Sequence, residues 1–513
     1  MDVRLAELVA AFALGQDNAF GQPLGSRLRA CVVAARLAEF IGLSAADRET
    51  VYWVAQLRYL GCTGHAHEVA AVFGDEIALR SQSLVSDFTD PREVLPAIVR
   101  TAGSAHSGVR RAKDVVAMLA GGRAYMQMNF QTGCEVADAL LVRLRMSDEV
   151  RKSLRYTFER WNGRGFPNGA KGTSIPLPMR IVDLCQDLEV LARVQGPDNA
   201  IATVRRRGGV YDPEVVDAST SLGPDVFFEL DKLDPWDEAL AAEPEPQRVL
   251  SGSALDDALL VAADFIDLKS PYTAGHSRGV ATLAAAAAEH MGLDSAAVRE
   301  VGRAALVHDF GRTAVPNSIW DKPGPLTRSE MDRVQLHPML TEQILRRCTG
   351  LAALVPAASC HHEKLDGSGY AKGLSGSGLS PAARIVAVAD CYHAMTEDRA
   401  HRPALSASQA AVELRAMVEA GLLDESAADG VLQAAGHIGT ATKRRKYPAG
   451  LTDREVQVLR LAVQGWTVRQ IAQELVISPK TAGHHIQHIY TKIGVSTRGA
   501  AALFAIENDL VQT

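Results

Sequence analysis

Histidines and aspartates recur at five places between residues 267 and 402, each inside an otherwise apolar, helical pattern. Burying an imidazole or a carboxylate without a partner is costly, and a metal ion supplies such a partner. The mixture of imidazole and carboxylate suits iron, manganese or zinc better than magnesium or calcium, which prefer oxygen ligands. The candidate ligands are His276, His308, Asp309, His337, His361, His362 and Asp390.

Seven ligands exceed the need of one ion, so we expect two divalent transition-metal ions, iron or manganese in preference to zinc. Asp309 is the natural carboxylate bridge between them. Two such ions about 3.5–4 Å apart can activate a water molecule and stabilise the leaving oxygen of a phosphodiester. Any one buried histidine is as readily a hydrogen-bonded core residue, so the metal interpretation rests on all seven side chains together.

The elements that must position these side chains are helices. Apolar residues at helical spacing predict helices over 256–268, 278–291, 297–308, 330–347 and 382–395. The pairs His308-Asp309 and His361-His362 fall at helix ends, and the second pair precedes a turn-forming run at 366–369. Ligands at helix ends and on facing helices are a usual way to build a metal site in a helical bundle.

The chain contains one helical unit twice. The segment that begins at Gly25 matches the one that begins at Gly275, and a later match has a smaller offset, so the first copy holds about 46 additional residues between about 64 and 133. Arg58 brings a cation to the place of a metal ligand, so the first copy is expected to be structural or sensory. The residues of this copy at the seven ligand positions are Ser26, Arg58, Tyr59, Gly133, Thr157, Phe158 and Gln186.

The second copy resembles the HD-GYP branch of the HD phosphohydrolases over roughly residues 255–436. The motifs that carry the resemblance are His308-Asp309-Phe310-Gly311-Arg312, His337-Pro338, His361-His362-Glu363, Asp366-Gly367-Ser368-Gly369-Tyr370-Ala371, Asp390 and Arg399-Ala400-His401-Arg402. That family hydrolyses cyclic di-GMP, a bacterial second messenger, at a dinuclear or trinuclear metal centre. The resemblance implies one ion held by His276, His308, Asp309 and Asp390, and another held by Asp309, His337, His361 and His362.

The same resemblance implies catalytic roles for Asp309 and Arg312. A third metal normally needs a glutamate four residues before the first histidine, where this chain has Tyr272, so two metals are expected. The implied substrate-binding residues are Arg312, Tyr370, Arg399 and Arg402.

The sequence departs from the HD-GYP pattern at three positions outside the ligand set. Arg312 replaces a lysine, Ala371 replaces the signature proline, and Thr341 replaces a glycine. An arginine fork is not equivalent to a point-charge ammonium. These departures bear on substrate recognition and turnover, and not on metal binding.

The stretch 451–505 has the pattern of a compact helical DNA-binding module. Thr452 and Glu455 form a capping box that opens a first helix, a short second helix covers 471–475, and Ser478 caps a third that runs through Tyr490. The third helix presents a polar face suited to the major groove. The candidate DNA-binding residues on it are Lys480, Thr481, His484, His485, His488 and Lys492.

This stretch closely resembles LuxR-type helix-turn-helix domains, with the third helix as the recognition helix. The resemblance implies double-stranded promoter DNA as a partner, read at a roughly palindromic site by paired domains, and therefore a homodimer. The alternative is a helical protein-interaction module, which predicts no salt-sensitive affinity for DNA.

The charge distribution along the chain favours DNA as the partner of this module. Residues 443–513 hold ten Lys and Arg against five Asp and Glu, so they carry +5, which leaves −11 for the rest of a chain whose formal charge is −6.

Composition bounds the class and the compartment. Low aromatic content, 5% of residues, and abundant alanine favour helix over sheet, so an all-α fold is expected. Seven scattered cysteines without a CxxC pair fit a reduced cytoplasm. The longest apolar stretch, 280–288, is too short to cross a membrane, and the acidic N-terminus reads as a helix rather than an export signal. We therefore expect a cytoplasmic protein with no membrane partner.

The predicted architecture is two tandem HD-type helical domains, the first degenerate, followed by a four-helix LuxR-type domain. The expected boundaries are a degenerate domain at 1–234, a linker at 235–254, an HD-GYP-like domain at 255–436, a basic linker at 437–449 and the DNA-binding domain at 450–513. The basic linker includes a KRRK run at 443–446.

The leading hypothesis is a transcriptional regulator whose middle domain binds and hydrolyses cyclic di-GMP or a related nucleotide second messenger. One alternative is a non-catalytic, metal-stabilised nucleotide sensor that controls the DNA-binding domain. Another is an HD phosphohydrolase that acts on a different phosphoester.

Overall fold

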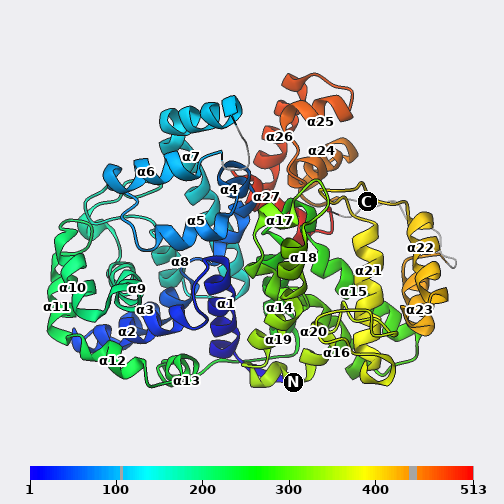
Figure 1. Ribbon diagram of the computed structural model, residues 1–513, viewed down its shortest axis with the longest axis horizontal. Helices are drawn as coiled ribbons and strands as arrows, with labels where there is room; N and C mark the ends of the chain where they lie inside the picture. The colour runs from blue at the N-terminus through cyan, green and yellow to red at the C-terminus, as the bar shows by residue number, and fades with distance from the viewer. Residues whose placement is uncertain (104–107, 438–446, 512–513) are drawn as a thin grey trace. The chain divides into compact units, whose positions relative to one another are not determined.

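The computed structural model describes residues 1–103, 108–437 and 447–511. Helices make up almost all of its regular structure (Figure 1), which confirms the predicted all-α class. In the described residues the only two strands are β1 (Asp2–Arg4) and β2 (Val249–Ser251), which pair antiparallel with Asp2 opposite Ser251. The chain divides into two compact units, residues 1–255 with 347–350 and residues 256–346 with 351–513.

The first unit is a helical bundle in which α2 packs on α3 and α9. The additional residues of this copy form α4, α5, α6 and the first part of α7. The helices of the unit are α1 (Leu5–Ala19), α2 (Ser26–Phe40), α3 (Ala45–Leu57), α4 (Ala66–Phe73), α5 (Glu76–Ser83), α6 (Pro91–Thr101), α7 (Gly108–Arg143), α8 (Asp148–Leu154), α9 (Leu177–Gln195), α10 (Pro197–Arg206), α11 (Pro213–Leu222), α12 (Asp225–Leu230) and α13 (Pro235–Ala241).

The segment 235–254, predicted to be a linker, contains α13, β2 and the first residues of α14. Asp234 accepts a hydrogen bond from the Trp236 amide (2.8 Å) and caps α13, while Pro235 occupies the first turn, where its missing N–H costs nothing. Trp236 is buried, and β2 follows α13. The second predicted linker, with the KRRK run at 443–446, lies largely outside the described residues.

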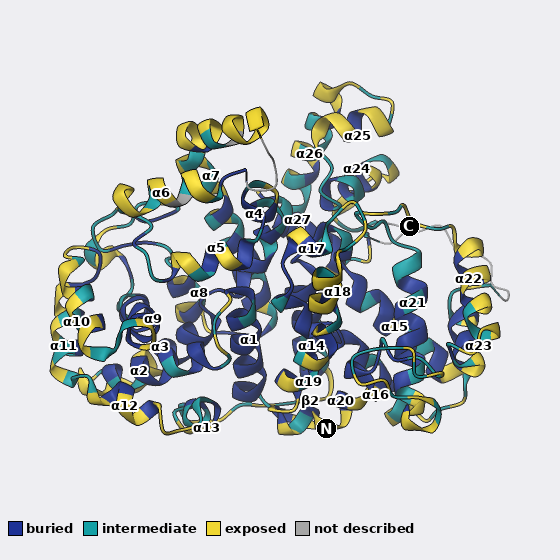
Figure 2. Cartoon of the chain, in the orientation of Figure 1, coloured by how far each residue is buried: buried dark blue, intermediate teal, exposed yellow. Residues whose placement is uncertain are grey.

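In the second unit, α15 packs against α16, α21 and α23. The alanine-rich sequence of α15 permits this close packing, and Ala284, Ala287 and Ala288 are completely buried. Figure 2 shows α14 and α21 as largely buried and α22 with an exposed face. The helices before the C-terminal module are α14 (Gly252–Asp267), α15 (His276–His290), α16 (Ser295–Val307), α17 (Asn317–Trp320), α18 (Arg328–Gln335), α19 (His337–Leu345), α20 (Val355–Ser359), α21 (Pro381–Met395), α22 (Ala407–Glu419) and α23 (Glu425–Ala434).

One helix expected over 330–347 is in fact two, α18 and α19, which meet at Leu336. Pro338 is the physical reason, because it has no N–H to donate to the carbonyl of Val334 four residues earlier and its ring crowds that carbonyl. The break makes His337 the first residue of α19.

Both copies hold the entry to their second helix in the same way. Gly25 and Gly275 adopt positive φ angles (95° and 83°) just before α2 and α15. Asp17 accepts hydrogen bonds from the amides of Gly25 (2.9 Å) and Arg27 (3.2 Å), and Asp267 accepts from the Ser277 amide (2.8 Å). Burial raises the pKa of both carboxyl groups to about 7. The repeat seen in the sequence is therefore also a repeat of backbone structure.

The C-terminal module has the four helices that were predicted. They are α24 (Asp453–Val463), α25 (Val468–Glu474), α26 (Pro479–Ile493) and α27 (Arg498–Glu507). The capping box of Thr452 and Glu455 is present, and the Ser478 side chain caps α26. Across the described residues, no helix combines the length and the apolar character needed to cross a bilayer.

Candidate metal centre and DNA-binding face

All seven candidate ligands meet in the second unit, and they come mainly from helix termini. His276 and His337 are the first residues of α15 and α19. The other ligands lie within three residues after a helix end or within α21. His308 and Asp309 follow α16, His361 and His362 follow α20, and Asp390 lies in α21. Six are buried, and the side chain of His362 is 26% exposed.

The ligands form two groups. In the first, Nε2 of His276 lies 3.0 Å from Oδ1 of Asp390, and Nε2 of His308 lies 4.0 Å from the same oxygen. In the second, Nε2 of His337 lies 3.0 Å from Nε2 of His361, and His362 lies close to both. Each group therefore offers three ligand atoms to one position.

Asp309 lies between the two groups and faces both. Its Oδ2 is 3.5 Å from Nε2 of His308. Its Oδ1 is 3.3 Å from Nε2 of His337 and 3.6 Å from Nε2 of His361. A carboxylate with one oxygen toward each group has the placement that a bridging ligand requires.

Helix termini also orient the histidine rings. Nδ1 of His308 donates to the carbonyl of Ala305 (2.7 Å), and Nδ1 of His361 donates to the carbonyl of Ala358 (2.7 Å). Both carbonyls belong to the last turn of a helix, where they have no intrahelical partner. Nδ1 of His337 donates to Val334 (2.6 Å), the carbonyl that Pro338 leaves free. Each ring thus directs an unprotonated Nε2 into the site.

The ionisation of the site suits a cation. Burial alone would raise the pKa of both carboxyl groups. Arg312 and the surrounding imidazoles hold the pKa of Asp309 well below its usual range, and His276, His362 and His308 do the same for Asp390. Burial lowers the pKa of His308 to about 4 and also lowers that of His337. His276 differs. Burial opposes its charge, yet Glu397 and Asp390 raise its pKa to about 10.

The expected substrate-binding residues lie at different distances from the ligands. Arg312 donates to Oδ2 of Asp309 (2.7 Å) and its guanidinium lies 4.1 Å from the centre of the Trp320 ring. Tyr370 packs beside His362, with ring centres 4.8 Å apart. Both contact a ligand directly.

The two remaining arginines are already engaged by protein groups. Arg399 donates to Glu397 (2.8 Å) and to the Tyr272 carbonyl (3.1 Å). Arg402 donates to carbonyls at the end of α21, including those of Ala394 (2.5 Å) and Met395 (3.2 Å). These contacts give Arg402 the role of a helix C-cap, and substrate contact by either arginine stays a prediction.

Two residues, Thr341 and Glu363, have supporting roles at the site that the sequence did not predict. The Thr341 hydroxyl accepts from the Gly311 amide and donates to the His308 carbonyl, both at 2.9 Å, so it braces the turn that carries Asp309. Glu363 accepts from the amides of Lys372 (2.7 Å) and Leu374 (3.0 Å), which holds the loop after Tyr370. The signal for Glu363 was its repeat partner Glu159, which binds Asn168 and Ala170 in the same way.

The equivalent place in the first unit is filled by arginines and aromatic rings. Arg58 pairs with Asp183 and donates to the Thr157 carbonyl (3.2 Å). Arg160 pairs with Asp183 (2.5 Å), and the rings of Tyr59 and Phe158 lie 5.8 Å apart. Among the described residues, the groups able to hold a metal ion all lie in the second unit. Guanidinium groups therefore supply the positive charge in the first copy.

Helix α26 presents the residues expected to contact DNA. Lys480, Thr481, His484 and His488 are exposed, and the other two are half-buried. A shallow concavity of about 510 Å³ runs along this face. Glu455 of α24 pairs with His488 (3.0 Å) and with Lys492 (2.8 Å), so these two side chains also stabilise the module. Residues that line the concavity include Thr481, His484, His485 and His488.

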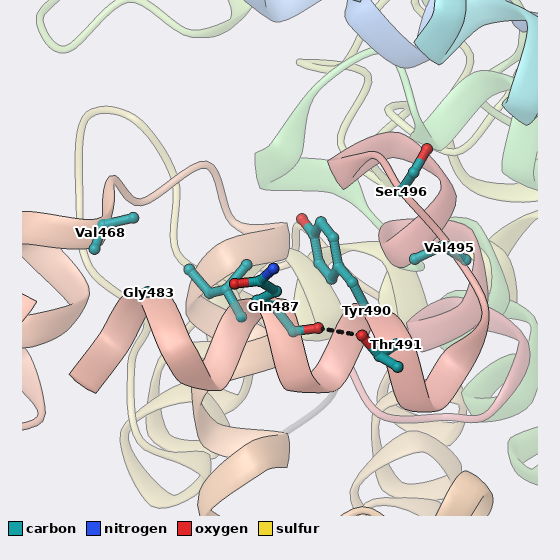
Figure 3. A pocket seen from close by; sticks show the side chains of 8 residues that line it. Val468, Gly483, Gln487, Tyr490, Thr491, Val495 and Ser496 are labelled. Atoms are coloured by element: carbon teal, nitrogen blue, oxygen red, sulfur yellow. Dashed lines mark hydrogen bonds between the residues drawn. The ribbon is translucent and has the colours of Figure 1, made fainter. Parts of the chain in front are cut away.

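A second concavity of about 360 Å³ borders the same helix and is more apolar. Figure 3 shows Tyr490 and Gln487 beside it, with Val468 on one side and Val495 on the other. The Thr491 hydroxyl donates to the Gln487 carbonyl (2.9 Å) and so is occupied within the helix.

Comparison with known proteins places both parts of the chain. The family described as HD domain matches residues 129–215 and 261–426, and the luxR family of bacterial regulatory proteins matches 449–505. A 3'3'-cGAMP-specific phosphodiesterase 3 of Vibrio cholerae is 30% identical over 410 residues, which is 79% of this chain and 89% of that protein. A cyclic di-GMP phosphodiesterase of Pseudomonas aeruginosa is 41% identical over 149 residues, 29% of this chain and 35% of that protein.

A solved structure covers more of the chain. The crystal structure of a cyclic GMP-AMP specific phosphodiesterase from V. cholerae, V-cGAP3, aligns with 86% of this chain and 99% of its own, at 26% identity and a TM-score of 0.58. An alignment of that extent includes residues of both compact units. Enzymes with an HD domain depend on metal ions, and the ligand groups described above fit that dependence. The chain therefore belongs to the HD-domain family, in its HD-GYP branch, and carries a C-terminal domain of the LuxR type.

Proposed function

We propose that the second unit hydrolyses a cyclic dinucleotide at a centre of two divalent transition-metal ions, iron or manganese in preference to zinc. The observation that carries this proposal is the placement of Asp309, whose two carboxylate oxygens face different ligand groups at 3.3–3.6 Å. His276, His308 and Asp390 would hold one ion with Asp309, and His337, His361 and His362 would hold the other. Such a pair would supply an activated water molecule and stabilisation of a leaving oxygen.

The side chains around the ligands supply the rest of the chemistry. The Arg312 guanidinium donates to the Asp309 carboxylate and so lies beside the candidate ligands. From there it could also bind a phosphate group of the substrate. Tyr370, next to His362, offers an aromatic face on which a nucleobase can stack. Hydrolysis adds one water molecule across one P–O bond and leaves a linear dinucleotide.

The names of the relatives support a cyclic dinucleotide as the substrate class. According to their names, the V. cholerae relative is specific for 3'3'-cGAMP, the solved V. cholerae structure is of a cyclic GMP-AMP specific enzyme, and the P. aeruginosa protein acts on cyclic di-GMP. All are cyclic dinucleotides, and the cGAMP-specific relative matches 79% of this chain. 3'3'-cGAMP therefore joins cyclic di-GMP, the substrate expected from sequence, as a candidate.

We further propose that this unit controls a promoter-binding domain. The LuxR-type module presents Lys480, Thr481 and His484 on α26 for contacts in the major groove. Binding or turnover of the nucleotide would bias how two such modules of a homodimer meet a pseudo-palindromic site.

Turnover of both dinucleotides by the purified full-length protein tests the enzyme. We expect product from at least one of them with Mn²⁺ or Fe²⁺, and none from His308→Ala or Asp309→Ala. His290→Ala, a matched change at an exposed histidine of α15, should keep the activity. Nucleotide binding by the wild type without turnover above the two ligand variants would instead identify a non-catalytic sensor.

A further inference from the structure

His276 is oriented differently from three other histidines of the centre. His308, His337 and His361 each donate Nδ1–H to a backbone carbonyl three residues earlier. His276 and His337 both begin a helix, but His337 follows the end of α18. A short turn at Pro271–Thr273 precedes His276, whose Nδ1 contacts side chains instead of a carbonyl. Its ring therefore needs a different acceptor to keep Nε2 directed at Asp390.

Glu397 occupies the position of that acceptor. Its Oε2 lies 2.8 Å from Nδ1 of His276, on the side of the ring opposite the 3.0 Å contact between Nε2 and Asp390. Glu397 follows the end of α21, seven residues after Asp390. One element thus carries a ligand and the group that would orient another ligand.

Two side chains hold Glu397 in this position. Arg399 donates to its Oε2 (2.8 Å) and also to the Tyr272 carbonyl in the turn before α15. Nδ1 of His393 lies 3.3 Å from the same oxygen and 3.1 Å from Nδ1 of His276. All four side chains are buried or nearly so.

The backbone of α15 makes room for this arrangement. A Cβ atom on Gly279 would lie 1.8 Å from Nε2 of His393, so only glycine at this position lets His393 reach His276. Gly279 lies three residues after His276, almost one turn further along the same helix. Gly279 therefore permits the packing of His393 in the group formed by His276, His393, Glu397 and Arg399.

We propose that Glu397 is a positioning residue that fixes the Nδ1–H tautomer of His276 and so presents Nε2 to a metal ion. A carboxylate behind a metal-bound histidine raises the basicity of the ring and sets its orientation. This inference rests on the proposed function, since it assigns a role at the same centre.

His276, His393 and Glu397 also have the composition of a metal site of their own. The guanidinium of Arg399 argues against that role, because it already donates to Glu397 and lies 3.4 Å from Nδ1 of His276. A resident cation there would repel a metal ion. In addition, a histidine that binds one metal through Nε2 could bind a second through Nδ1 only after losing its remaining proton.

Titration of the metal-free full-length protein with Mn²⁺ tests the role of Glu397, with stoichiometry and dissociation constants as the readout. The wild type should bind two ions. Glu397→Ala should bind one of them about 10- to 100-fold more weakly and leave the other unchanged. Glu397→Gln keeps an acceptor without the charge and should fall between. Glu229→Ala, the same change at a glutamate paired with Arg36 in the first unit, should match the wild type.

Each outcome separates this inference from the proposed function. Equal affinities in the wild type and Glu397→Ala would overturn the positioning role and leave the dinuclear centre intact. A third ion in the wild type that disappears in both His393→Ala and Glu397→Ala would make these residues ligands instead. A wild type that binds no Mn²⁺ would remove the metal centre itself, and this inference with it.

Discussion

The Nε2 atoms of His337 and His361 lie 3.0 Å apart, while the Nδ1–H of each ring donates to a backbone carbonyl. In this tautomer neither Nε2 carries a proton, so two lone pairs face each other inside the protein. Such a contact is unfavourable until a cation lies between the two nitrogens. The second unit should accordingly depend on metal for part of its stability.

Chelation should therefore lower the thermal unfolding temperature of the second unit. Mn²⁺ at 100 times its dissociation constant should raise the free energy of unfolding by about 2.7 kcal/mol over the metal-free protein. His361→Ala should lose most of this response, and His290→Ala, at an exposed histidine, should keep it. Calorimetry with and without chelator measures the effect, and a wild-type transition insensitive to Mn²⁺ would contradict it.

Metal binding should release a proton from His276. Glu397 and Asp390 raise the pKa of its ring to about 10, so below that pH the metal-free ring carries protons on both nitrogens. A metal ion at Nε2 must displace one of them, and the apparent affinity should rise by about tenfold per pH unit between pH 6 and 7. The pKa of His308, about 4, means that this ligand is already neutral there.

Calorimetric titration in buffers of different ionisation enthalpy counts the released protons. We expect about one proton for the ion bound by His276, and a count lowered by about one in His276→Gln. The same count in the wild type and His276→Gln would show that the proton comes from elsewhere.

Substitution of two equivalent glycines should separate the roles of the two copies. A Cβ atom on Gly311 would lie 2.0 Å from the His337 carbonyl oxygen, and one on Gly61 would lie 1.9 Å from the Gly133 carbonyl oxygen. Backbone must move in either case, so Gly311→Ala and Gly61→Ala should each destabilise their unit by about 3 kcal/mol or more.

Only one of these two substitutions should change the affinity for metal ions. Gly311→Ala displaces the turn that carries Asp309 from the helix that begins with His337, so it should also weaken Mn²⁺ binding. Gly61→Ala should lower the unfolding temperature of the first unit and leave Mn²⁺ affinity unchanged. A loss of metal affinity in Gly61→Ala would mean that the first copy supports the metal centre.

The seven candidate ligands were identified from the sequence because their order along the chain and their places at helix ends are local properties, and the structure brings these side chains together. His308 and His361 follow apolar helical runs, as expected, and the carbonyls of those helix ends orient their rings. Pro338 also indicates a helix break before His337, but the apolar pattern continues across this position and predicted one helix. Periodicity and proline chemistry disagreed there, and proline chemistry prevailed.

The support of His276 was harder to predict, because it depends on a contact between residues 121 apart in sequence. Asp390, His393 and Glu397 do follow a spacing of three and four residues, which places them on one helical face. A charged stripe of that kind is more often a solvated surface. These three side chains differ from a solvated stripe because α21 is largely buried. Burial of a whole helix depends on tertiary packing, which the local sequence does not show. The charged composition of 235–254 likewise gave no indication of α13, a capped helix that buries Trp236 and Ala239.

Replacement of Arg312 should reduce catalysis without loss of metal. Its guanidinium contacts Oδ2 of Asp309 and the Trp320 ring, so it is fixed beside the ligands rather than among them. Arg312→Ala should lower kcat/KM by about 10²- to 10³-fold with two Mn²⁺ ions still bound. Arg312→Lys should be less severe, because the charge is kept and the planar fork is lost. Release of the ions from Arg312→Ala would instead make this residue a support for Asp309.

DNA binding by the C-terminal module should depend on salt in a way that distinguishes two lysines on α26. Lys480 is exposed near the beginning of the helix, whereas Lys492 pairs with Glu455 (2.8 Å) and with the Gly450 carbonyl (3.1 Å). Each phosphate contact contributes about one to the slope of log K against log salt concentration. Lys480→Ala should therefore lower that slope by about one. Lys492→Ala should lower this slope less and should also lower the unfolding temperature of the module.

Fluorescence anisotropy of the full-length protein with a promoter fragment at several salt concentrations gives the slopes. A wild-type affinity that does not depend on salt concentration would favour a protein-interaction module instead.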